Sequence, residues 1–169
     1  MIKLSIERLT MESDTIVYGE VKTIQSLWSL DGSIILTVVT LRVHGILKGN
    51  VINNQVLIQY PGGEVGDIGF KQEDMPYFHV DEKVIVFLKS IKDVMNIKHS
   101  PTIAQNIFQA FSVFGAAQGK YSINKNQIAR KWGYSLLDKE VDKDNELTLS
   151  ELKTRVEVIV KTDLKKRQK

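Results

Sequence analysis

The stretch that decides the fold is Tyr60–Phe70, with the sequence YPGGEVGDIGF. Four glycines and one proline lie within these eleven residues, between the apolar runs VLIQY and KVIVFLK. Glycine is favoured where the backbone adopts positive φ or approaches another segment closely, so the stretch is predicted to be a shaped loop rather than a helix or a strand. The two flanking runs predict β-strands. We therefore expect a β-barrel or sandwich whose most constrained corner is this loop.

Working outward, the next strong signal is a long β-branched run over residues 33–47. Fifteen residues exceed the roughly 5–6 of a usual strand, which favours a strongly coiled strand shared by two halves of a small barrel. Asp31-Gly32 predicts a hairpin turn to a preceding strand over residues 15–24, in which Gly19 predicts a bulge. Further strands are expected over residues 55–60, 83–89, 111–117 and 119–123, with a hairpin turn at Lys125-Asn126.

Both ends of the chain predict helices. Ser5 can cap a short helix over residues 5–13, and Thr148-Leu-Ser-Glu151 is a capping box for a helix from Leu149 to about residue 160. The apolar stripe of the second helix is expected to dock on the barrel. It consists of Leu149, Leu152, Val156 and Ile159.

These elements predict a mostly β protein: a small antiparallel OB-type β-barrel with a short N-terminal helix and a C-terminal helix. We expect one domain over residues 1–162 and a basic disordered tail over residues 163–169. Residues 91–110 favour no single structure. The pattern does not determine the oligomeric state.

Composition is that of a globular protein, with 43% hydrophobic and 25% charged residues. There is no cysteine, which excludes disulfides and thiolate metal sites. No run approaches the roughly 20 apolar residues that a membrane span needs, and the first residues do not have the pattern of a leader peptide. The formal net charge of +3 comes from the last nine residues, which hold five basic side chains and one acid, so the rest is close to neutral. A basic nucleic-acid footprint on the body is therefore not evident.

Motifs for metals and catalysis are weak. Residues 142–153 have the acidic spacing of a calcium loop, but Leu147 stands where glycine is needed and Lys153 where a bidentate glutamate is needed. The three histidines, His44, His79 and His99, have no metal-ligand spacing. We predict no metal, no cofactor and no catalytic residues, and hence a protein that is not an enzyme.

Binding residues are expected around the glycine-rich loop. The candidates are Trp28, Tyr60, Gly62, Gly63 and Asp67. Asp67 is expected to cap backbone N–H groups and so to hold the loop. The carboxylates that surround this loop suit either acid–base chemistry or a solvated surface.

Several motifs, in their order along the chain, resemble a family. They are IVYGEV, Trp28, VTLRVHGILKGN, VLIQYPGGEVGDIGF, Pro76-Tyr77-Phe78, EKVIVFLK and QGKYSI. Together they resemble the cysteine-free OB-fold modules of exported or surface proteins of bacteria and archaea, which are similar to the netrin-like domain of tissue inhibitors of metalloproteinases. The resemblance covers residues 5–128, with PGGEVGDIGF and QGKY as its most specific parts.

The resemblance implies a location outside the cytoplasm, although the sequence itself leaves a cytoplasmic location open. It implies no established activity, and the cysteine by which the metalloproteinase inhibitors reach the catalytic metal is absent. We expect a non-enzymatic binding or accessory module that recognises a protein or a surface polymer, without membrane insertion. The alternative is a single-stranded nucleic-acid-binding OB-fold protein, which would use exposed aromatic residues.

Overall fold

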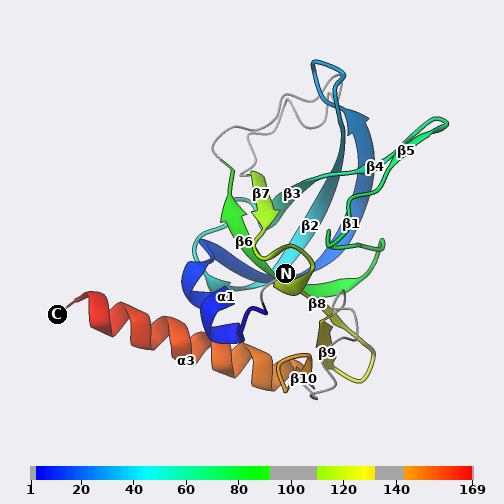
Figure 1. The fold of residues 1–169 in the computed structure, drawn as a ribbon. Helices are drawn as coiled ribbons and strands as arrows, with labels where there is room; N and C mark the ends of the chain where they lie inside the picture. The colour runs from blue at the N-terminus through cyan, green and yellow to red at the C-terminus, as the bar shows by residue number, and fades with distance from the viewer. Residues whose placement is uncertain (1–2, 92–109, 132–142, 169) are drawn as a thin grey trace.

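The computed structural model describes residues 3–91, 110–131 and 143–168. Its centre is a closed five-stranded β-barrel (Figure 1). The barrel strands are β1 (Thr15–Trp28), β2 (Ile35–Lys48), β3 (Gln55–Pro61), β6 (Lys83–Ser90) and β7 (Ala110–Val113). Their order is β1-β2-β3-β7-β6, and β6 pairs back onto β1 to close the barrel. All these pairs are antiparallel except β3 and β7, which run parallel. The predicted OB-type barrel is confirmed.

Closure depends on the bend of β1. This strand pairs with β2 over nearly its whole length and with β6 over residues 15–20. Its pairing with β2 shifts register between Tyr18 and Gly19, where the sequence predicts a bulge. A Cβ on Gly19 would lie 2.5 Å from the Arg42 carbonyl oxygen, so only glycine allows the two strands to approach this closely.

The predicted turn between β1 and β2 is confirmed and is held by Asp31. Its carboxylate accepts hydrogen bonds from the hydroxyl groups of Ser29 and Ser33 and from the Ser33 N–H. These bonds lower the pKa of Asp31 to about 2. Gly32 follows with φ +70°, which glycine adopts without strain.

Three further strands extend the sheet beyond the barrel: β8 (Lys120–Ile123), β9 (Ile128–Lys131) and β10 (Glu146–Thr148). The predicted hairpin turn joins β8 to β9, where the Asn124 side chain accepts bonds from two backbone N–H groups. The strand expected over residues 111–117 is shorter than predicted. It ends at Val113, and a 3₁₀ turn, η1 (Ala116–Gly119), follows Gly115. Strand β10 was not predicted from the sequence.

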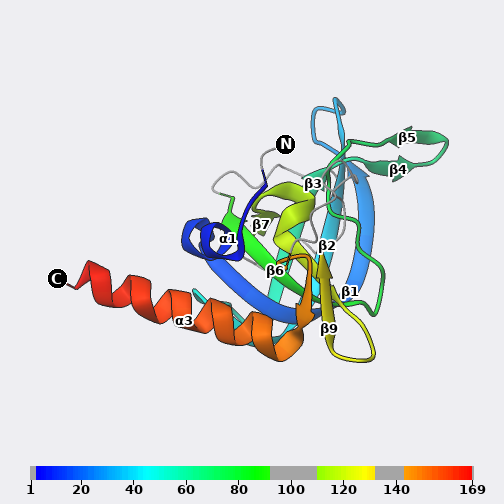
Figure 2. The ribbon, with the colours of Figure 1, turned by 60° about the horizontal axis from the view of Figure 1, so that its bottom comes forward.

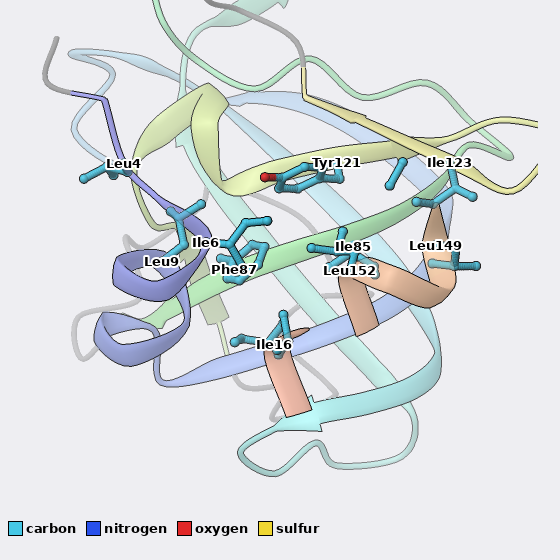
Figure 3. Packing of buried hydrophobic residues seen from close by; sticks show 12 residues of the cluster. Leu4, Ile6, Leu9, Ile16, Ile85, Phe87, Tyr121, Ile123, Leu149 and Leu152 are labelled. Atoms are coloured by element: carbon cyan, nitrogen blue, oxygen red, sulfur yellow. The ribbon is translucent and has the colours of Figure 1, made fainter. Parts of the chain in front are cut away.

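Two hydrophobic cores share the barrel wall. One fills the barrel interior and includes Val39, Ile58 and Phe111. The other lies between the outside of the barrel and the helices α1 (Ile6–Glu12) and α3 (Leu149–Arg167). Figure 3 shows side chains of this second core converging from both helices and from the neighbouring strands, which are β1, β6, β8 and β9. Those that Figure 3 labels are Leu4, Ile6, Leu9, Ile16, Ile85, Phe87, Tyr121, Ile123, Leu149 and Leu152.

The C-terminal helix begins as predicted and ends later. Thr148 and Glu151 form the reciprocal capping box, and Leu149, Leu152 and Val156 are buried. The helix continues to Arg167, so residues 163–167, expected to be a disordered tail, form its last turns. These turns project beyond the barrel in Figures 1 and 2. Within the described ranges, no helix is both long enough and apolar enough to cross a membrane.

An ion-pair cluster joins the two helices outside the second core. Arg155 donates to Glu7 Oε1 and to Asp144 Oδ1, each at 2.8 Å. Asp144 Oδ2 also accepts the Ile6 N–H at 3.3 Å, and its carbonyl accepts the Tyr121 hydroxyl at 2.7 Å. In the segment with the acidic spacing of a calcium loop, Asp144 is therefore already engaged by a guanidinium and a backbone amide. Asp142 lies outside the described residues.

The pKa values of both carboxylates in this cluster are lowered. For Glu7 the main cause is the hydrogen bond from Arg155. For Asp144 burial raises the pKa, but the bonds from Arg155 and the Ile6 N–H outweigh it. A lowered folded-state pKa means that the stabilisation is present above the unfolded-state value, near 4, and is lost as the pH falls through the folded-state value.

We predict that Arg155→Gln lowers the free energy of unfolding at pH 7 by about 1–2 kcal/mol, since the Asp144 side chain is only 15% exposed, whereas the Glu7 pair is screened by solvent. The difference from the parent should shrink as the pH falls towards about 3, because the stabilisation by both carboxylates is progressively lost below their unfolded-state pKa values, near 4. Urea unfolding at the two pH values measures it. Arg8→Gln, which removes an exposed pair with Glu12, is the control and should change stability by less than about 0.5 kcal/mol. An equal loss for Arg155→Gln at both pH values would contradict the assignment.

Candidate functional site

The glycine-rich stretch folds into a β-hairpin. Its strands are β4 (Gly63–Val65) and β5 (Ile68–Phe70), joined by Gly66 and Asp67. The prediction of a loop without strands is therefore wrong. Gly66, with φ +60°, occupies the first central position of the turn, where two-residue hairpins favour glycine. Both views of the ribbon show the hairpin reaching away from the barrel (Figures 1 and 2).

Two adjacent glycines fix the base of this hairpin. Gly62 and Gly63 have φ values of +113° and +127°. A Cβ on Gly63 would lie 2.3 Å from Ser26 Oγ and 2.6 Å from Thr37 Oγ1. The Thr37 hydroxyl donates to the Gly62 carbonyl at 2.7 Å. The hairpin is thus seated directly on β1 and β2, at a place where a side chain would not fit.

Beside the hairpin lie two adjoining cavities, of about 610 and 670 Å³. They share Lys71, Tyr77 and Phe78 in their lining. We call the combined feature the aromatic groove; its aromatic residues are Tyr60, Phe70, Tyr77 and Phe78. The rings of Tyr60 and Phe78 stack with centroids 6.2 Å apart and planes at 27°. Phe78 is buried, whereas Phe70 and Tyr77 are 49% and 54% exposed. The groove therefore combines a packed floor with two accessible rings.

Charges in the groove are few. Lys71 places its ammonium 5.3 Å from the centroid of the Tyr77 ring. The carboxylates in the lining are those of Glu64, Asp74 and Glu82. Burial raises the pKa of the Tyr60 hydroxyl, and a hydrogen bond with Thr37 opposes this rise. The phenol therefore stays neutral at physiological pH and can only exchange hydrogen bonds.

A buried ion pair supports the groove from beneath. Lys120 Nζ donates to Glu82 Oε1 at 2.7 Å and to the Tyr77 carbonyl, and it lies 4.8 Å from the centroid of the Phe78 ring. The side chains of Lys120 and Glu82 are only 8% and 14% exposed. Glu82 also accepts the Ser122 hydroxyl and, at 3.1 Å, the backbone N–H of His79. Burial lowers the pKa of Lys120, and the contact with Glu82 opposes this. The segment that carries Tyr77 and Phe78 is thereby fixed to β8.

Lys120 belongs to the QGKY motif, and the other three residues of the motif also have structural contacts. Gln118 Oε1 accepts the Leu4 N–H at 2.7 Å in the interior. A Cβ on Gly119 would lie 1.9 Å from the Phe114 carbonyl oxygen. Tyr121 reaches Asp144 beside the helices, as described above. The motif therefore connects the N-terminal segment, the groove and the helices.

The structure brings some of the predicted binding residues together and leaves others apart. Tyr60, Gly62 and Gly63 line the aromatic groove. Trp28 lies at the end of β1, partly buried, and is not in the lining. Asp67 lies exposed in the hairpin turn, and within the described part of the chain no backbone N–H donates to it, so the expected cap is not formed.

Sequence reasoning misplaces three side chains near the groove, those of Ile68, Phe70 and Tyr77. The apolar residues of the glycine-rich stretch predict that Ile68 or Phe70 packs on the barrel, but Ile68 is 56% exposed and Phe70 is half exposed. The sequence also predicts that the three aromatic residues Phe70, Tyr77 and Phe78 tuck against the barrel. Only Phe78 does so, because successive residues of an extended segment point to opposite sides. That alternation is the signal that could have identified Tyr77 as accessible.

Other candidate sites are less suited to binding. A cleft of about 610 Å³ lies between α1 and the last turns of α3, but its charges are paired within the chain. Lys48 donates to the carbonyls of Thr10 and Met11, and two ion pairs, Lys89–Asp14 and Arg167–Asp163, lie beside it. Across the described ranges, no group of histidines and carboxylates is arranged to hold a metal. His99 lies outside those ranges.

No protein-family model matches the chain, and no curated protein is significantly similar to it. What the aromatic groove can bind therefore follows from its own side chains: accessible aromatic faces, one lysine and a few carboxylates.

We predict that Gly63→Ala is more damaging than Gly66→Ala, although both residues have positive φ. The strain of placing alanine there costs roughly 1–2 kcal/mol at either position. At Gly63 the clash with Ser26 and Thr37 adds about 1–3 kcal/mol, whereas a Cβ on Gly66 has no atom within 4 Å. Thermal unfolding of the two variants measures the difference. Equal losses would show that the hairpin is not seated on β1 and β2.

Proposed function

We propose that the protein is a non-enzymatic binding module that holds an extended segment of a partner protein in the aromatic groove. The observation that carries the proposal is the exposure of Phe70 and Tyr77 beside the stacked rings of Tyr60 and Phe78. Aromatic side chains supply much of the binding energy in protein interfaces, because they bury a large area with little loss of conformational entropy. Rings held half exposed on a rigid barrel suit that role.

The charges favour a peptide over a nucleic acid. A nucleic-acid site needs several cations that follow the phosphate backbone. In the groove Lys71 is exposed, but Lys120 is buried and paired with Glu82. Glu64 and Asp74 add negative charge to the lining. Phosphates would meet more carboxylates than cations here, whereas a mostly apolar peptide segment would not be repelled.

The resemblance to cysteine-free OB-fold, netrin-like modules also supports a non-enzymatic binding module. It favours a role outside the cytoplasm as an accessory module that recognises a protein or a surface polymer. Aromatic faces also stack on sugar rings, so a polysaccharide is the nearest alternative ligand, and the experiment separates it from a peptide.

The test uses peptides selected from a random displayed library against the full chain, then titrated against variants. Phe70→Ser and Tyr77→Ser should each weaken binding at least about tenfold, the loss typical of a central aromatic contact. Ile52→Ser is the matched control, because Ile52 is 49% exposed, as Phe70 is, but does not line the groove. It should leave the affinity unchanged.

Two further probes are titrated in parallel: oligothymidine and a neutral soluble polysaccharide. Salt-sensitive oligothymidine binding that Phe70→Ser abolishes would replace the proposal with nucleic-acid recognition. Polysaccharide binding lost in the same variant, without peptide binding, would replace it with polymer recognition. Peptides that bind all the variants equally would remove the groove as the site.

A further inference from the structure

The outer edge of β5 is open. Among the residues that the structure describes, β4 is the only strand that pairs with β5. In a hairpin closed by a two-residue turn, the residues flanking the turn form a hydrogen-bonded pair, here Val65 and Ile68. Hydrogen-bonded pairs alternate along an antiparallel ladder, so the Gly63–Phe70 pair is hydrogen-bonded too. Gly69, between them, directs its own N–H and C=O to the outer edge.

This edge is also accessible and apolar. Ile68 and Phe70 are 56% and 49% exposed, and Asp67, Gly69 and Lys71 are exposed as well. Both ribbon views show the hairpin projecting away from the barrel (Figures 1 and 2). A strand edge that is unpaired and carries exposed apolar side chains is a template for another strand. What remains to be decided is which strand it accepts.

The sequence along the edge is complementary to itself. We infer that a second copy of this chain pairs its β5 with this edge, antiparallel and centred on Gly69. Each Gly69 then exchanges two hydrogen bonds with Gly69 of the other copy. Ile68 lies opposite Phe70 of the other copy, and Asp67 lies opposite its Lys71. The two hairpins form one four-stranded antiparallel sheet about a twofold axis.

Charge selects this register over its neighbours. The twofold axis can pass through a hydrogen-bonded pair, at Asp67, Gly69 or Lys71, or through a non-hydrogen-bonded pair, at Ile68 or Phe70. Centring on Ile68 or on Phe70 places neither Asp67 nor Lys71 opposite an opposite charge, so these registers gain no ion pair. Centring on Asp67 or on Lys71 places two identical charges opposite each other. A parallel arrangement places Asp67 opposite Asp67 and Lys71 opposite Lys71 of the other copy, which is unfavourable twice. Centring on Gly69 places an aspartate opposite a lysine twice and Ile68 opposite Phe70 twice. A twofold interface requires this kind of self-complementarity.

The interface is small, so the dimer is weak. Stable complexes bury roughly 1,200–2,000 Å², and a contact of about five residues from each copy falls below that range. Association should therefore depend on protein concentration and, through the two ion pairs, on salt. The inference goes beyond the proposed function, because β5 pairing requires no ligand in the groove.

Sedimentation equilibrium with charge-swapped variants tests the pairing. The parent should self-associate as its concentration rises towards about 1 mM, the range in which weak complexes are populated. Asp67→Lys places two lysines opposite each other, and Lys71→Asp places two aspartates opposite each other. Each variant alone should associate at least about tenfold more weakly than the parent. Lys125→Asp, an equal charge change at an exposed turn residue of another hairpin, should associate like the parent.

An equimolar mixture of the two variants is the decisive sample. In the mixed pair, Lys at position 67 faces Asp at position 71, and Asp67 faces Lys71, so association should return to at least the parent level. This recovery excludes misfolding as the reason for the losses. A parent that stays monomeric, single variants that associate like the parent, or a mixture that does not recover would each overturn the inference. None of these results depends on a groove ligand, so the proposed function is tested separately.

Discussion

The groove depends on one buried cation. Removing a lysine from water is costly unless a carboxylate and further acceptors replace its hydration. Lys120 has these replacements in Glu82, the Tyr77 carbonyl and the face of the Phe78 ring. All three acceptors belong to the segment that leads into β6, so satisfying the lysine also fixes that segment. The accessible ring of Tyr77 and the packed ring of Phe78 owe their positions to this contact.

Strand β8, which carries Lys120, links the groove to the helices. Successive residues of a strand point to opposite faces, so Lys120 and Ser122 meet Glu82 while Tyr121 and Ile123 enter the core beneath α1 and α3. Tyr121 continues to Asp144, whose carboxylate meets Arg155 on α3. A change at β8 therefore reaches both the aromatic groove and the helical layer.

The parts that the sequence predicted are those governed by local rules. The cap at Ser5, the box at Thr148 and the turn at Asp31-Gly32 each depend on residues within four positions of one another, and all three are present. The barrel followed from the alternation and length of its strands. The last turns of α3 were missed because a run of basic residues was read as a solvated tail. Positive charges near a helix C-terminus interact favourably with the helix dipole, so the basic run in fact favours a longer helix.

The candidate site was only half predictable, for a different reason. The glycines at positions 62 and 63 signalled a constrained backbone, and they are constrained. Their spacing could not show that two three-residue strands run from Gly63 to Phe70. The burial of Lys120 could not be foreseen either, since lysine is normally exposed and its partner Glu82 lies 38 positions away. The accessible ring of Tyr77 was missed as well, although the alternation of side chains along an extended segment points to it. The compartment and the partner remain predictions from resemblance and side-chain chemistry.

Amide hydrogen exchange of Lys120→Met tests the central role of the buried lysine most directly. The Asp81 N–H donates to the Val21 carbonyl at 2.8 Å and reports on the segment that the lysine holds. We predict that Lys120→Met abolishes protection at Asp81 and loosens the contact between the Tyr60 and Phe78 rings, while amides between β2 and β3 keep their protection. Adding Glu82→Gln removes the buried carboxylate charge that has lost its lysine partner, and it should restore part of the lost stability. Unchanged protection at Asp81 in Lys120→Met would contradict the account, because the segment would then be held on the barrel without the ion pair.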